Sequence, residues 1–323
     1  MSPLNSTSFI NATIVRPDFF VISGFEGIPH ANYYYVFLCF VYAVSVLGNA
    51  FVMFVIYTDH SLHTPKYIVV FNLALTDLCG STAVVPQMID TLLFKSHLIS
   101  YEACLTNMFF VFGCLNMQSF TLMFLSYDRF VAICHPLRYH EIVTNKSMLV
   151  ITIILWIIAG LVILVAVLFI NRLSFCKSIV VNSFFCDHGA LTLLACDDNP
   201  PSAVINVLDS IIILWFPALF ITCTYICIAR ALFKIADASE RVKAMKTCTS
   251  HLILVSVFYF PICITYAMGS AIPLNAWIVN MSLTTVLPPM LNPIIYSLKT
   301  EEFTESIKKL YRRNKINFAV RNK

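Results

Sequence analysis

The chain has 323 residues, of which 59% are hydrophobic and only 12% are charged, and its mean hydropathy is +0.81. Soluble domains carry about 25% charged residues, so this composition excludes a soluble protein and indicates a membrane protein. The formal net charge of +4 is modest, and we expect no nucleic-acid partner.

The first 30 residues are predicted to form an extracellular tail. Two glycosylation acceptors lie in it, Asn5 in "NST" and Asn11 in "NAT". A basic start followed by a compact apolar core and a cleavage site would indicate a signal peptide, and this pattern is missing. We therefore expect the first apolar run to target the chain to the membrane.

Apolar runs long enough to cross a membrane follow the tail. A spanning helix needs about 20 apolar residues, whereas the uncharged stretch 247–298 would be about 78 Å long as one helix. The breakers in "GSAIPLN" at 269–275 divide it in two. The predicted fold is an all-α membrane protein, a seven-transmembrane helix bundle forming one domain over 1–323, with spans at 31–57, 67–94, 104–127, 148–170, 203–229, 247–270 and 276–298.

The distribution of basic residues predicts the orientation of the bundle. Lys and Arg gather in cytoplasmic loops. If the amino terminus is outside, 17 of the 21 basic residues lie in inner segments. The four that remain outside are Arg16, Lys95, Arg172 and Lys177.

The cytoplasmic tail, 299–323, is predicted to contain a short amphipathic eighth helix. The stretch "TEEFTESIKKLYRRNK" begins acidic and ends basic, as the helix dipole favours. Phe303, Ile307 and Leu310 recur at helical spacing, so this helix is expected to lie on the membrane lipid. A solvated tail is the alternative.

Four of the twelve cysteines lie on the predicted outer side, Cys104, Cys176, Cys186 and Cys196. This side faces an oxidising compartment, where disulfides persist. Four cysteines allow three pairings, among which spacing cannot choose. Free thiols are the alternative, and the ligands in "CDH" at 186–188 are too close together for a zinc site. We predict a disulfide-stapled outer loop and no bound metal at these cysteines.

Polar residues inside the spans indicate a functional interior. Ionisable groups at membrane depth are costly and tend to be functional, and the candidates are Asp77 and Asp209. Asn49 and Asn292 lie in the inner halves of their spans, as Asp77 does, and all three are predicted to form a polar core. Two interpretations stay open: a structural cluster that joins helices, or a hydrated element with a sodium ion near Asp77.

Stripes of residues at helical spacing predict a ligand site in the outer half of the bundle. Plain helix packing explains most such stripes, but together these would line an apolar cavity with a few polar groups. Prolines at 217, 261, 288, 289 and 293 predict kinks that let the last three spans move. The predicted ligand-binding residues are Met108, Phe112, Leu115, Asn116, Asn206, Asp209, Tyr259, Cys263 and Tyr266.

Several motifs carry a family likeness. "LGN" at 47–49, "LALTDL" at 73–78, "SYDRFVAICHPLRY" at 126–139 and "LNPIIY" at 291–296 occur in order on spans one, two, three and seven. This pattern resembles the rhodopsin-like G-protein-coupled receptors. "HTPKY" at 63–67, "KAMKTCTSHL" at 243–252 and the outer loop with three cysteines narrow the resemblance to odorant receptors. The "SYDRF" and "HPLRY" forms resemble the fish-like class I branch.

The resemblance implies a function and a set of residue roles. It implies disulfides Cys104–Cys186 and Cys176–Cys196, with a small-molecule odorant among spans three, five, six and seven. It implies a G-protein switch in which Asp128 restrains Arg129 at rest. A stimulatory olfactory G protein would then raise cyclic AMP, at the plasma membrane of olfactory neuron cilia, with no cofactor and no enzyme activity. The implied switch residues are Asp128, Arg129, Tyr225 and Tyr296.

Three departures from the family pattern qualify these expectations. Lys66 stands where the family usually has methionine, and Gln118 stands where many members have an acid near Asp77, which weakens the sodium interpretation. Asp209 does not come from the family pattern; it would pair with a cationic ligand or stay a neutral acid. The alternative functions are a non-olfactory receptor for an amine or a peptide and, less favoured, a channel or transporter.

Overall fold

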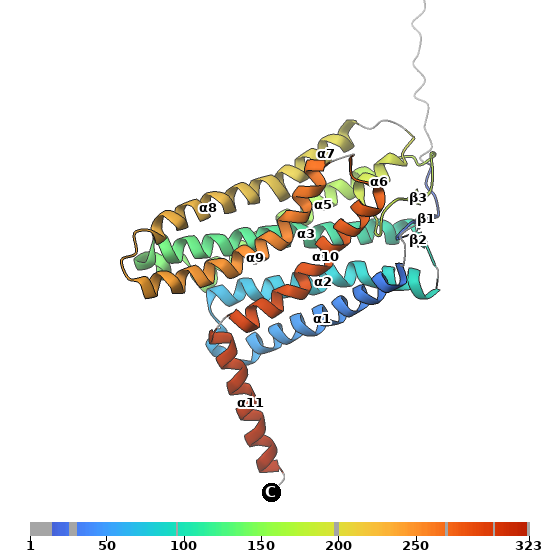
Figure 1. The fold of residues 1–323 in the computed structure, drawn as a ribbon. Coiled ribbons are helices and arrows are strands. Elements are labelled where there is room, and N and C mark those ends of the chain that lie inside the picture. Colours follow the sequence, from blue (N-terminus) through green and yellow to red (C-terminus); the bar gives the residue numbers. More distant parts are fainter. Residues whose placement is uncertain are drawn as a thin grey trace, which may run out of the picture.

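The computed structural model describes residues 15–25, 31–94, 96–196, 200–268, 271–299 and 301–321. Within these ranges seven helices are long and apolar enough to cross a membrane, which confirms the predicted bundle (Figure 1). Span five is divided by a π-helical turn, η3. The spans are α1 (Ala31–Thr58), α2 (Pro65–Phe94), α3 (Tyr101–Cys134), α5 (Asn145–Ile170), the series α7 (Pro200–Ser210), η3 (Ile211–Trp215) and α8 (Phe216–Leu232), α9 (Ala238–Met268) and α10 (Leu274–Lys299).

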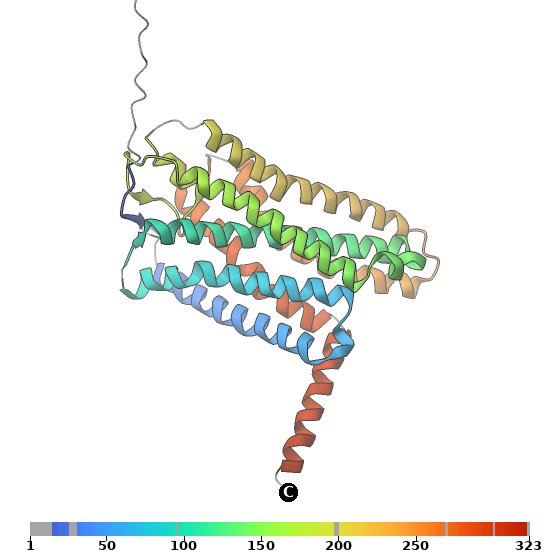
Figure 2. The same ribbon diagram turned by 180° about the vertical axis from the view of Figure 1, so that it is seen from behind.

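Helix α3 forms the centre of the bundle. It contacts α2, α5, α8 and α9, and both ribbon views show it running between its neighbours (Figures 1 and 2). Every residue from 116 to 122 is buried, including polar Asn116, Gln118 and Ser119. Buried polar groups need hydrogen-bond partners, so this stretch of α3 is where the functional contacts between helices are expected.

Helix α5 shows how the bundle meets the membrane. It has no Asp, Glu or Arg, and its single lysine, Lys146, lies in its first turn. Large apolar side chains on its outward face are exposed, because hydrocarbon replaces water as their solvent. The exposed residues on this face include Leu149, Ile153, Ile157, Leu161 and Leu168.

A small β-sheet that the sequence did not predict covers the outer end of the bundle. Its strands are β1 (Phe19–Ile22), β2 (Leu98–Ser100) and β3 (Val180–Val181), in the order β2-β1-β3. β1 pairs antiparallel with β2 and parallel with β3. Since successive strand side chains point to opposite faces, Phe20 and Ile22 are both buried. Part of the predicted tail is therefore built into the outer surface.

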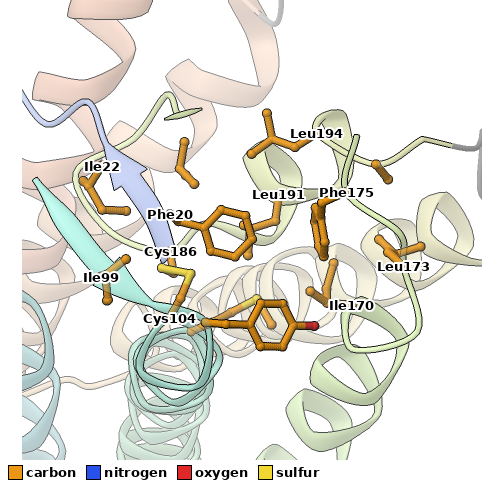
Figure 3. Packing of buried hydrophobic residues seen from close by; sticks show 14 residues of the cluster. Phe20, Ile22, Ile99, Cys104, Ile170, Leu173, Phe175, Cys186, Leu191 and Leu194 are labelled. Atoms are coloured by element: carbon orange, nitrogen blue, oxygen red, sulfur yellow. A yellow bond between two sulfur atoms is a disulfide. The ribbon is translucent and has the colours of Figure 1, made fainter. Parts of the chain in front are cut away.

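The side chains beneath this sheet form a closed apolar cluster (Figure 3). Phe20 packs edge-on against Phe175, with ring centroids 5.2 Å apart. Below it lies the disulfide between Cys104 of α3 and Cys186 of the outer loop, and both cysteines are 0% exposed. A second disulfide joins Cys176 to Cys196 within the loop. The structure thus contains the two pairings that the resemblance implied and that spacing left open.

At the inner end, short turns join the spans and a further helix leaves the bundle. The turns are η1 (His60–Leu62), η2 (Pro136–Arg138) and α4 (Tyr139–Ile142). Helix α11 (Glu301–Arg321) points away from the bundle at a wide angle in both views (Figures 1 and 2). Phe303 is 0% exposed in a cluster with residues of α1 and α2, so the start of α11 is anchored by apolar packing. This helix is longer than the short one predicted.

Candidate functional site

A narrow cavity lies between α3, α5 and α7 in the outer half of the bundle, beneath the outer loop. Its lining comes from those three spans and from α6 (His188–Leu193) of the loop. Most of the lining is apolar, and the polar exceptions are His188 and Asp209. The lining residues are Met108 and Phe112 of α3, Ile163 and Ala166 of α5, His188 of α6, and Ile205 and Asp209 of α7.

The Cys104–Cys186 disulfide positions the roof of this cavity. Cys104 lies one turn before Met108 on the same face of α3, since residues four apart share a helix face. Cys186 comes just before α6, whose first turn is capped by Asp187: its Oδ1 accepts a hydrogen bond of 2.8 Å from the Ala190 backbone N–H. The disulfide and the cap together hold His188 over the cavity.

Three of the predicted ligand residues, Met108, Phe112 and Asp209, line this cavity. The resemblance implied a ligand among spans three, five, six and seven, whereas this cavity is also lined by Ile163 and Ala166 of span four. No described residue of spans six or seven lines this cavity. Sequence reasoning missed Ile163 and Ala166 because aliphatic residues on an apolar helix carry no distinguishing signal.

The other predicted ligand residues lie deeper or elsewhere. Leu115 packs between the outer and inner apolar clusters, and Asn116 is 0% exposed, with neither amide atom hydrogen-bonded among the described residues. Cys263 is exposed and lies outside the cavity. α9 runs without a break through Pro261, which lies between Tyr259 and Cys263. The side chains of Asn206 and Tyr266, and all of Asn5 and Asn11, lie outside the described residues.

Tyr259 connects three spans below the cavity. Ser119 of α3 donates a hydrogen bond to the backbone carbonyl of Ile213 in η3, so the Tyr259 hydroxyl donates to the Ser119 oxygen, 2.7 Å away. A π-helical turn often marks a functional site, and here its carbonyl is used by a side chain of another span. This contact couples α3, η3 and α9 about two helical turns beyond Phe112 along α3.

The polar core forms around Asp77, which is 0% exposed. Gln118 Nε2 donates to its Oδ1 at 2.7 Å, and Asn292 Nδ2 donates to its Oδ2 at 2.6 Å. Asn49, expected beside Asp77, instead donates to the Pro289 backbone carbonyl at 2.8 Å. Because Pro293 has no N–H, the carbonyl of Pro289 in the preceding turn lacks its helical partner, and Asn49 takes that place.

The two amide donors also bear on the sodium interpretation. Each carboxylate oxygen of Asp77 accepts a hydrogen bond from an amide N–H, which leaves one lone pair on each oxygen for a cation. Gln118 is neutral, so the described site offers a single negative charge. The residues fit a hydrogen-bonded cluster that joins α2, α3 and α10 better than a cation site.

An Asp77→Asn substitution is expected to destabilise the receptor by about 1–3 kcal/mol, because the new amide N–H faces Gln118 or Asn292, each of which now donates to Asp77 and would have to turn over to accept. The double variant Asp77→Asn/Asn292→Asp restores a donor and an acceptor at each contact and should recover most of the loss. Thermal unfolding of the purified protein measures both. A double variant no more stable than Asp77→Asn alone would contradict the assigned contact.

The inner half of the bundle holds the residues of the predicted switch. Arg129 Nη1 lies 3.6 Å from Asp128 Oδ2, and Tyr139 of α4 donates a hydrogen bond of 2.8 Å to Asp128 Oδ1. Burial, reinforced by the Asp128 carboxylate, raises the pKa of Tyr139, which keeps its hydroxyl protonated as a donor. The loop after α3 therefore holds the carboxylate that faces Arg129.

A second set of contacts ties α9 to α3 and α8. His251 ring nitrogens lie 2.7 Å from the Tyr225 hydroxyl and 3.1 Å from the Leu122 backbone carbonyl. Tyr296 of α10 is partly buried, and its hydroxyl makes no hydrogen bond among the described residues. Sequence reasoning assigned Tyr225 and Tyr296 to the switch but gave no role to His251, although it stands in a quoted motif.

These groups surround an inner cavity of about 790 Å3. Arg129, His251 and Tyr296 lie at its wall, and the charged residues around it are predominantly basic. Lys66, one of them, forms an ion pair of 3.1 Å with Glu302 of α11. The structure thus places the two cavities at opposite ends of α3, with the Ser119–Tyr259 contact between them.

Comparison with known proteins decides the family. The family model described as olfactory receptor matches residues 38–314. The chain belongs to the olfactory receptor family. It is 35% identical to olfactory receptor 51F2 of Homo sapiens, over 98% of this chain and 95% of that one. It is 33% identical to olfactory receptor 51E2 of Homo sapiens, over 96% of each chain.

The receptor also shares its fold with a solved structure. Squid rhodopsin superimposes with a TM-score of 0.70 at 19% identity, covering 89% of this chain and 87% of that one. The chain is therefore a multi-pass membrane receptor with the G-protein-coupled receptor fold, and it is not an enzyme. A small-molecule ligand and a G protein are its general partners.

Proposed function

We propose that the receptor binds a small odorant in the outer cavity and activates a stimulatory, olfactory-type G protein, which raises cyclic AMP. One observation carries this proposal. Met108 and Phe112 line the outer cavity, and Leu125 and Arg129 of the same helix line the inner one. A ligand that shifts α3 against its neighbours would therefore change the contacts of this helix in both cavities.

The contacts between the cavities provide a route for that change. A ligand shifts an equilibrium only through its different affinities for two states. Displacement of α7 by a ligand at Asp209 would move η3, whose Ile213 carbonyl is bonded to Ser119, and Ser119 in turn holds Tyr259. Because α9 also carries His251, which contacts Leu122 and Tyr225, movement of α9 would open the inner cavity.

The inner cavity has the charge expected of a surface that receives a G protein. Arg129, Lys243 and Lys246 line it and would attract carboxylate groups of a partner helix. The ion pair between Asp128 and Arg129 fits a resting state in which Arg129 is not yet free to contact the G protein. Family membership supports the odorant over a peptide ligand, the olfactory subtype of G protein and a location in neuronal cilia.

An odorant panel with a cyclic AMP readout tests the proposal. Cells expressing the receptor are expected to respond to at least one small volatile ligand, and cells that lack stimulatory α-subunits should lose the response. Returning the olfactory α-subunit should restore it. A response that persists without any stimulatory α-subunit would overturn the assigned coupling. A ligand-gated current that needs no G protein would overturn the receptor assignment itself.

A further inference from the structure

The outer cavity contains one acidic side chain. Among the lining residues Asp209 is the single acid, and none is Lys or Arg. Its Oδ1 is buried and has no hydrogen-bond partner among the described residues. The side chains of Met108, Ile163 and Ile205 are apolar and cannot satisfy a carboxylate oxygen, and the other polar side chain of the lining is His188.

A carboxyl group in such surroundings keeps its charge only when it has a partner, and otherwise it takes up a proton. Burying a charge is expensive unless it is paired and hydrogen-bonded, and acids inside membrane spans usually mark a functional site. The described lining contains no lysine or arginine, and its histidine, His188, makes no hydrogen bond to Asp209 Oδ1. A ligand that carries a cation would recover both the ion pair and the hydrogen bond.

We propose that Asp209 is the counter-ion for a small aliphatic amine, with the ammonium group at Oδ1 and the alkyl chain against Met108, Ile163 and Ile205. This assignment names the ligand class of the outer cavity, and it rests on the proposed function of that cavity. The cavity has a volume of about 10 Å3, room for about one water, so even a short amine must move the surrounding side chains apart when it binds. A carboxylic acid of the same length would meet Asp209 as a like charge, and an alcohol would form the hydrogen bond without the charge pair.

Three probes of equal length separate these cases: n-butylamine, n-butanol and butyric acid. On the unmodified receptor the amine is expected to be the most potent of the three, both in cyclic AMP production and in thermal stabilisation of the purified protein. In the Asp209→Asn variant, its potency should fall by about 30-fold or more, the effect of removing one partner of a buried charge pair. n-Butanol should change by less than about threefold, because asparagine keeps a hydrogen-bonding group.

Asp90→Asn is the matched control, because Asp90 is an exposed acid at the outer part of α2 and does not line the cavity. It should leave all three potencies unchanged. An equal loss for amine and alcohol in Asp209→Asn, or an unchanged amine potency, would overturn the proposal. If Asp209→Asn fails to reach the surface, the unmodified receptor decides: n-butanol or butyric acid at least as potent as n-butylamine overturns it.

The two proposals fail in different ways. If n-butylamine stabilises the purified receptor but no ligand raises cyclic AMP, the counter-ion assignment stands and the proposed coupling fails. If other odorants raise cyclic AMP while n-butylamine neither signals nor stabilises the protein, the coupling stands and the counter-ion assignment fails.

Discussion

An Arg129→Ala receptor is expected to reach the cell surface in normal amounts and to give no cyclic AMP response to any agonist of the unmodified chain. The Arg129 side chain is 17% exposed, lines the inner cavity and pairs with Asp128 at 3.6 Å. Its removal takes away the cation proposed to meet the G protein. The helix around it keeps its packing, because alanine is a good helix former. Surface labelling and cyclic AMP are measured on the same cells.

Two further variants show whether the loss belongs to the switch. Arg138 is also a basic residue on the inner side, but it is 71% exposed and, among the described residues, its ion pair is with Glu141, so Arg138→Ala should keep the response. Asp128→Asn weakens the restraint on Arg129 while still accepting the Tyr139 hydrogen bond, and it should raise basal cyclic AMP. A normal agonist response in Arg129→Ala at normal surface expression would refute the switch assignment.

Removing the disulfide of the cavity roof should have the second large effect. The double variant Cys104→Ala/Cys186→Ala is expected to lose most of its surface expression, by roughly fivefold or more, since a native disulfide contributes about 2–5 kcal/mol and smaller losses already change abundance several-fold. The bond joins residues 82 apart in sequence. It fastens the outer loop to α3 inside the apolar cluster of Figure 3.

The second disulfide provides the comparison. Cys176 and Cys196 are 20 residues apart and close a ring within the outer loop itself, and Cys176 is exposed. Cys176→Ala/Cys196→Ala is expected to lower surface expression by less than about twofold. A disulfide that closes a shorter loop removes less entropy from the unfolded chain, and this one holds less apolar surface in place. Flow cytometry of a surface tag compares the two pairs. Equal expression of both double variants would contradict the ranking.

Apolar length and charge were sufficient to predict the bundle. A helix in hydrocarbon must satisfy its own backbone hydrogen bonds, so each span is a local property of about 20 residues, and all seven were found. The ends were less accurate: α3 continues to Cys134 and α9 begins at Ala238. Helices continue into water wherever the local residues favour them, and hydropathy does not detect that extension.

Residues with distinctive chemistry were also predictable from the sequence. Acids at membrane depth drew attention to Asp77 and Asp209 without any structure, because their burial is costly whatever surrounds them. The family likeness added Asp128 and Arg129. The residues that complete the sites, among them Ile163, His188 and His251, carried no comparable signal, since an aliphatic or a lone histidine is ordinary in most positions.

Which residues far apart in the sequence contact each other was decided only by the tertiary structure. The sequence predicted Asn49 near Asp77, but α1 packs on α10 so that Asn49 donates its hydrogen bond to the Pro289 carbonyl. It likewise left three disulfide pairings open, and it did not show that β1 closes the outer face. What the sequence determined is set by each helix alone, through its apolar length and its buried charges. What only the fold decided depends on how the helices turn and pack against one another, because a side chain's partner is chosen by a neighbour distant in sequence.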